Sequence, residues 1–180
     1  MVDAPNRTDR IAAYAEAMLS VARAEGTIGE VSDELFRFAR ALEGNDALRE
    51  TLTDARLPAS RRQQIVEDLL GGKASGLTVA LVSMAVGAGR ARDLPAIIDA
   101  LVHLSAAEAD KEVAEVRSTI DLDDDQRRRL AEALQRATGK PVEVKVIIDP
   151  TVLGGLVATI GDTVIDGSVR HRLDQLKNAI

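Results

Sequence analysis

Apolar residues recur every three or four positions along the first part of the chain, which is the spacing that gathers them on one face of an α-helix. Glycine or proline interrupts this pattern at short intervals, and several segments start with a residue that can cap a helix. The pattern predicts six helices joined by short turns. They are expected to start near Thr8, before Val31, and near Asn45, Pro58, Ser75 and Asp93, with Thr8 as the cap of the first.

The period changes to two residues after about position 115, where apolar and more polar side chains alternate. This alternation predicts one strand around Val116 to Ile120 and a second along Val142 to Ile148. Two further short strands flank Gly161-Asp162, a pair that is typical of a tight hairpin turn. Between the first two strands, Asp123 and Gln126 form a capping box that starts a helix.

Ser168 is predicted to cap a last helix, which carries Leu173 and Leu176 on one side. The chain is therefore expected to be mainly α, with an N-terminal six-helix bundle followed by a small α/β C-terminal domain. The boundary is predicted close to Glu112, which gives domains of residues 1–112 and 113–180.

Candidate chemistry is sparse along the whole chain. Cysteine is absent, and two histidines, His103 and His171, are too few for a histidine-rich metal site. Gly71-Gly72-Lys73 lacks the residue spacing of a phosphate-binding loop, and the acidic run at Asp121–Asp125 is explained by the start of a helix. No catalytic residue, cofactor site or metal ligand can be named, so the sequence predicts a protein that is not an enzyme.

Charge is distributed unevenly, with a formal net charge of −6 for the whole chain. Residues 1–115 hold 13 basic and 19 acidic side chains, whereas residues 116–180 hold 10 of each. Nucleic-acid binding depends on neutralising phosphates, so the acidic helical part disfavours it and suits a protein partner with a basic contact surface. The longest weakly charged stretch, Gly71 to Gly89, is too short and too interrupted to span a bilayer, and no direct membrane insertion is expected.

The first and fifth predicted helices are apolar on more than one face. Ala17 and Val21 lie off the main stripe of the first helix, and Val79 and Val82 lie off that of the fifth. A helix that is apolar on nearly all sides is either fully buried or packed against a partner, and the pattern favours neither reading over the other. Small residues on these helices would leave a shallow groove for an amphipathic partner helix.

The C-terminal 35 residues carry an unusual order of elements. An aliphatic strand ends in aspartate, and a Gly-Gly pair, an alternating strand, Gly-Asp, Val-Ile-Asp and Gly-Ser follow before the last helix. The Gly-Gly pair predicts a bulge or a close backbone approach. The structural motif of this predicted domain is assigned to Gly154, Gly155, Gly161, Asp166 and Ser168.

This order of residues resembles the delta subunit family of bacterial ATP synthase, which is related to the mitochondrial oligomycin sensitivity-conferring protein. The stretch Tyr14 to Met18 is similar to the family's N-terminal Tyr-Ala-x-Ala opening, and Gly89-Arg90 with Leu94-Pro95 is similar to its central element. The resemblance covers essentially the whole chain.

The resemblance implies a non-catalytic stator subunit of a rotary ATP synthase, at the periphery of the cytoplasmic face of the cell membrane. It implies a hetero-oligomer in which the helical domain binds N-terminal helices of the alpha subunits and the α/β domain binds the b subunit of the peripheral stalk. By the same resemblance, the alpha-binding groove lies between the first and fifth helices and is assigned to Tyr14, Ala17, Met18, Val79 and Val82. The alternative hypothesis is a helical adaptor of a nucleic-acid-associated complex, which would require a basic face.

Overall fold

The computed structural model describes residues 6–152 and 154–167, and contacts within the chain divide it into two compact units, Met1–Ser105 and Ala106–Ile180. The division falls in the last part of a helix, a few residues before the boundary predicted after residue 112. The predicted last helix, together with its cap Ser168, lies outside the described residues.

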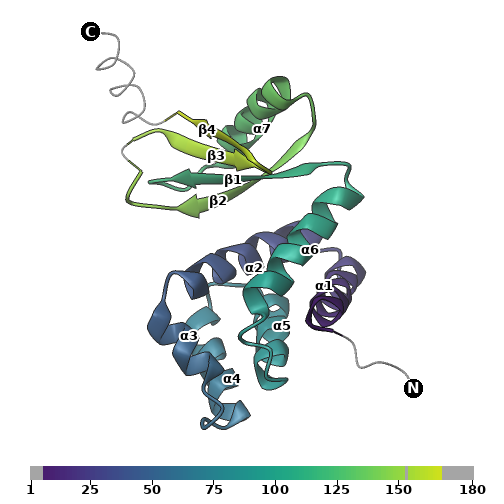
Figure 1. Cartoon of the computed structure of the whole chain (residues 1–180), viewed down its shortest axis with the longest axis vertical. Helices are drawn as coiled ribbons and strands as arrows, with labels where there is room; N and C mark the ends of the chain where they lie inside the picture. The colour runs from purple at the N-terminus through teal and green to yellow at the C-terminus, as the bar shows by residue number, and fades with distance from the viewer. Residues whose placement is uncertain (1–5, 153, 168–180) are drawn as a thin grey trace. The chain divides into compact units, whose positions relative to one another are not determined.

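The first unit is helical, as predicted (Figure 1). Its helices are α1 (Arg7–Ala24), α2 (Ile28–Glu43), α3 (Asp46–Thr53), α4 (Ala59–Leu70), α5 (Gly76–Gly87) and α6 (Leu94–Glu108), of which α6 runs past the division between the units. The core is mostly aliphatic, and its fully buried side chains include Leu35, Leu42, Leu52, Val66, Leu94, Ile97 and Ile98. The scarcity of aromatic residues is therefore compensated by branched aliphatic packing between helices.

Local capping chemistry explains where the helices begin. Asn45 accepts a hydrogen bond from the Leu48 amide, which confirms that it caps the third helix as its position predicts. Ser75, near which the fifth helix was expected to start, accepts one from the Thr78 amide and is the cap of α5. The predicted cap at Thr8 is wrong. Asn6 caps α1, because Asp9 returns a hydrogen bond to the Asn6 amide and completes a capping box that Thr8 could not form.

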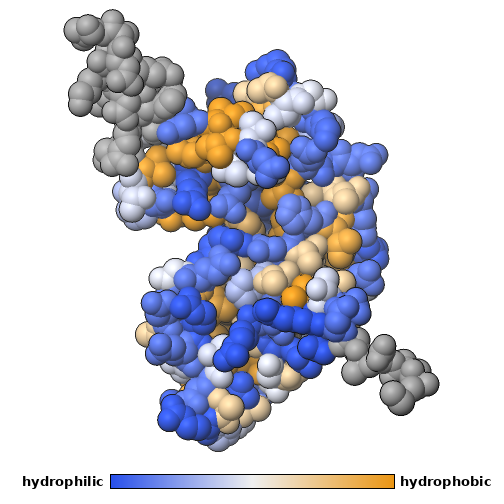
Figure 2. Space-filling model, viewed as in Figure 1, coloured by the Kyte–Doolittle hydropathy of each residue, from blue (hydrophilic) through white to orange (hydrophobic). Residues whose placement is uncertain are grey.

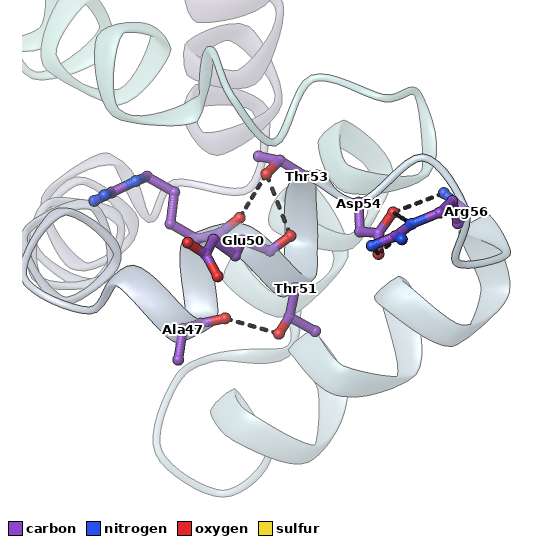
Figure 3. Close-up of polar contacts among 7 residues, drawn as sticks. Ala47, Glu50, Thr51, Thr53, Asp54 and Arg56 are labelled. Atoms are coloured by element: carbon purple, nitrogen blue, oxygen red, sulfur yellow. Dashed lines mark hydrogen bonds and ion pairs between the residues drawn. The ribbon is translucent and has the colours of Figure 1, made fainter.

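Short helix α3 is ended by its own side chains (Figure 3). The Thr51 hydroxyl donates to the Ala47 carbonyl at 2.7 Å, and the Thr53 hydroxyl donates to the Glu50 carbonyl at 3.3 Å. Asp54 then accepts from the backbone amide and the guanidinium of Arg56, and these hydrogen bonds lower the pKa of the Asp54 carboxyl. Such side-chain bonds compete with helix continuation and turn the chain toward α4.

A partly buried hydrogen-bond cluster ties α2 to the start of α5. The Glu34 carboxylate accepts from the Ser75 amide at 2.9 Å and from the Ser75 hydroxyl at 2.7 Å. Burial raises the pKa of Glu34, but hydrogen bonds from Thr78 and Ser75 and the charge of Arg37 outweigh it and bring the pKa below the ordinary value of 4.5. Glu34 therefore stays ionised at neutral pH and fixes the first turn of α5.

Glu34→Gln is expected to destabilise the chain at pH 7 by about 1 kcal/mol, because a charge-assisted acceptor becomes a neutral one. The folded-state pKa is lowered, so this contribution is present above the unfolded pKa and disappears as the pH falls through the folded pKa. Urea unfolding should therefore show a smaller penalty at pH 3.5 than at pH 7. Glu67→Gln, on the exposed side of α4, is the control and should cost little at either pH; an equal penalty for Glu34→Gln at both values would contradict the assignment.

The second unit is a four-stranded sheet with one described helix, α7 (Asp124–Thr138) (Figure 1). Its strands are β1 (Glu112–Ser118), β2 (Val142–Ile148), β3 (Leu156–Ile160) and β4 (Thr163–Asp166), in the spatial order β2-β1-β3-β4. β1 and β2 are parallel and are joined through α7, whereas β1–β3 and β3–β4 are antiparallel. Together with the helical first unit, this confirms the predicted fold class.

One face of the sheet builds the core of this unit. Alternate residues of neighbouring strands share that face by register, including Ala114, Val116, Val144 and Ala158, and Leu134 of α7 packs against them. The capping box of Asp123 and Gln126 at the start of α7 is confirmed. The first strand differs from its prediction, because it ends at Ser118 and leaves Ile120 beyond it with 63% exposure.

Candidate partner-binding surface

The five residues assigned to the alpha-binding groove differ in burial: some lie in the core of the helical unit and others reach its surface. Met18 of α1 and Val82 of α5 are completely buried. Tyr14 and Val79 are half-buried, and Ala17 is exposed. Ala17 and parts of Tyr14 and Val79 therefore reach the surface, while Met18 and Val82 support it from the core.

Two surface residues on the same helices were not assigned from the sequence. Among the described residues of the helical unit, the large apolar side chains that remain exposed are Val21 of α1, at 42%, and Met84 of α5, at 47%. Val21 follows Tyr14 and Ala17 at i+7 and i+4, so these three form one row along α1. In the sequence, such a surface shows as a second row of apolar residues beside the row that faces the core. Both rows repeat with the helical period, so the pattern alone does not tell which of them is exposed.

A similar row runs along α5. Leu77, Ala80, Met84 and Ala88 follow at i, i+3, i+7 and i+11, which places them along one side of the helix and onto the residue just after it. Ala80, Met84 and Ala88 are exposed, and Leu77 is half-buried. Small alanines beside a long, flexible methionine make a shallow apolar surface that can adapt to a helical partner.

Polar contacts hold α1 close to the end of α5. The Arg90 guanidinium, three residues after α5, lies 5.9 Å from the centre of the Tyr14 ring. Arg7 pairs with Asp93 at 2.8 Å and ties the first turn of α1 to the same connection. Each contact is weak alone at a surface, but together they keep the N-terminal half of α1 beside the α5–α6 connection.

The surface of the molecule combines apolar and polar areas. Figure 2 shows one face of the molecule, on which apolar patches lie within a mostly hydrophilic surface. Within residues 6–152 and 154–167, no group of three or more His, Asp or Glu side chains converges in a way that could hold a metal ion. No helix in these ranges is both long and apolar enough to cross a membrane.

The glycine motif of the second unit lies in its turns. Gly154 and Gly155 have φ values of 65° and 77° and follow β2 in the connection to β3. Gly161 has a φ of 54° and, with Asp162, forms the two-residue turn between β3 and β4 that was predicted. A left-handed backbone is accessible to glycine at little cost, which explains why glycine stands at these three positions.

Asp166 is the last residue of β4 and pairs with Val157 of β3. Upstream, the Asp149 carboxylate accepts from the Thr151 hydroxyl at 2.6 Å and from the Thr151 amide at 2.9 Å. These bonds, with a smaller effect of the Arg117 charge, lower the pKa of Asp149. The motif therefore organises connections of the sheet, and its fifth member, Ser168, lies outside the described residues.

Comparison with known proteins gives a consistent family assignment. The family model for the ATP synthase delta (OSCP) subunit matches residues 11–180. ATP synthase subunit delta of Nocardia farcinica is 44% identical over 165 residues, which cover 92% of this chain and 61% of that protein. ATP synthase subunit delta of Streptomyces avermitilis is 39% identical over 161 residues, covering 89% and 59%. The chain thus spans about three fifths of the length of these relatives.

A solved structure supports the fold. A chain in the cryo-EM structure of the Toxoplasma gondii mitochondrial ATP synthase hexamer superimposes with a TM-score of 0.55, covering 94% of this chain and 96% of its own length. The two are 22% identical, so this likeness concerns the fold alone. From the match over residues 11–180 and the identity to these relatives, the chain belongs to the ATP synthase delta (OSCP) subunit family.

Proposed function

We propose that the chain is a non-catalytic stator subunit of a proton-translocating ATP synthase, which links the catalytic head to the peripheral stalk. Membership of the delta (OSCP) family supports this proposal. The observation that carries it is the position of two large apolar side chains that are exposed among the described residues of the helical unit. Val21 and Met84 lie on α1 and α5, the two helices that the family resemblance assigns to the alpha subunits.

In this proposal the helical unit binds the N-terminal helices of the alpha subunits through the apolar rows of α1 and α5. An amphipathic helix would bury its apolar side against Tyr14, Ala17, Val21 and Met84. The contact surface is apolar, and the acidic balance of residues 1–115 favours an approaching segment with basic residues at its margins. Met18 and Val82 keep α1 and α5 in place beneath this contact.

The α/β unit is proposed to bind the b subunit of the stalk, so that the chain is a peripheral component on the cytoplasmic face of the cell membrane. A stator resists the torque of the rotor, and this task needs stiff elements and slow dissociation. Two separate packed units suit it, because each provides a rigid base for one contact. The alternative of a nucleic-acid adaptor finds no support in the family comparison or in the acidic helical part.

Reconstitution tests the stator role directly. Membranes from the organism that encodes the chain would be stripped of the head and of the delta subunit, and recombined with purified head in the presence or absence of this chain. We expect the chain to restore head binding and ATP synthesis driven by a proton gradient, while ATP hydrolysis by the free head is the same with and without it. Head binding and synthesis that do not depend on the chain would refute the proposal.

A further inference from the structure

A hollow on the helical unit offers a site that the stator role does not use. It has a volume of about 320 Å³, within the range of small-molecule sites. α2, α3, the end of α4 and the turn before α5 line it, and its apolar wall consists of Phe38, Ala41, Leu48, Leu69, Leu70 and Ala74. Leu48, Leu69 and Leu70 are only half-buried, so a ligand could still remove apolar surface from water.

Four polar residues also line the hollow, and the side chains of two of them already accept hydrogen bonds from within the chain. The Glu34 carboxylate accepts three hydrogen bonds from Ser75, and Asn45 accepts one from the Leu48 amide. The other two, Arg37 and Lys73, have exposed side chains. In the described part of the chain neither side chain donates a hydrogen bond or forms a close ion pair, although the charge of Arg37 also acts on Glu34. The available polar chemistry of the hollow is therefore that of two cations.

This combination selects the class of ligand. Arg37 and Lys73 repel a cationic head group, and a neutral hydrocarbon would gain no hydrogen bond or ion pair from them. A carboxylate can accept from a guanidinium and an ammonium at once, in hydrogen bonds that are stronger than neutral ones. Glu34 repels the same head group, so the head group is expected on the Arg37 and Lys73 side of the hollow with the hydrocarbon chain along the leucines.

We propose that this hollow binds a small anionic amphiphile of the medium-chain fatty acid class, with its chain against Leu48, Leu69 and Leu70 and its carboxylate between Arg37 and Lys73. No lining residue belongs to the apolar rows of α1 and α5, so this site and the alpha-binding surface are separate. The proposal does not depend on the stator role.

Decanoate, used below its micelle concentration, is the probe. The full ¹⁵N-labelled chain would be titrated and followed by two-dimensional NMR. We expect saturable shifts confined to amides of α2, α3 and residues 69–75, with a dissociation constant on the order of 1 mM or below. Decanol should bind about fivefold more weakly, and decyltrimethylammonium should give no saturable shift there.

Lys73→Gln is expected to weaken decanoate binding about fivefold, and Arg37→Gln with Lys73→Gln more than tenfold, while decanol binding stays unchanged. Both side chains are exposed, and Arg61→Gln, an exposed arginine of α4 outside the lining, is the matched control. Equal affinity for decanoate and decanol, or shifts spread over the whole bundle, would overturn the proposal. Displacement of decanoate by an alpha-subunit N-terminal segment would also overturn it, because the hollow would then be a protein contact.

Discussion

Replacing Val21 and Met84 together by glutamate is expected to reduce the affinity for the N-terminal segment of the ATP synthase alpha subunit by at least about a hundredfold. Each substitution puts a carboxylate into a contact that excludes water, and a buried charge without a partner is costly. Both side chains are about half exposed in the free chain, so the fold should tolerate the change. Isothermal titration of the full chain with a synthetic alpha-subunit segment measures the loss.

Ala12→Glu is the matched control for this experiment. Ala12 is exposed on α1 but lies two residues before Tyr14, which places it about 200° around the helix from the Tyr14, Ala17 and Val21 row. It adds the same charge to the same helix and should leave the affinity within about twofold. Unfolding curves should be similar for both variants. Undiminished binding by the Val21→Glu/Met84→Glu variant would remove the α1 and α5 rows from the interface.

The burial of individual residues in the candidate surface could be predicted only in part from the sequence. Helical spacing identified α1 and α5 as apolar beyond one stripe, and that feature is local to each helix. It could not decide that Met18 and Val82 face the core while Val21 and Met84 face solvent, because both rows repeat with the same period. That choice depends on where the other helices of the bundle pack, which is long-range information.

Local features, which depend on residues only a few positions apart, were predicted more reliably than the burial of α1 and α5. The Asp123 and Gln126 capping box and the turn at Gly161-Asp162 depend only on near neighbours, and both are confirmed. The Asn6 cap of α1 was missed although its signal, a reciprocal partner at Asp9, was present. By contrast, the hollow beside Arg37 and Lys73 joins residues far apart in the sequence, and no local pattern could predict it.

Val116→Asp is expected to destabilise the α/β unit by more than about 4 kcal/mol, because it puts a carboxylate among apolar neighbours without a hydrogen-bond partner. Val116 is completely buried on β1, which pairs with β2 on one side and β3 on the other. A unit of this size is stable by only about 4–11 kcal/mol, so most or all of its stability should be lost. Hydrogen exchange followed by mass spectrometry should show amides of β1, β2 and β3 exchanging rapidly.

We expect the two units to fold separately, and the same measurement tests this. The helical unit has its own core, and none of the residues packed around Val116 belongs to it, so α1 to α5 should keep their protection in the Val116→Asp variant. Val164→Asp makes the same chemical change at a β4 residue that is 62% exposed, and it should alter stability by less than about 0.5 kcal/mol. If α1 to α5 lost protection together with the sheet, the two units would form one cooperative body. A stator built of them would then transmit load through a single core instead of through two.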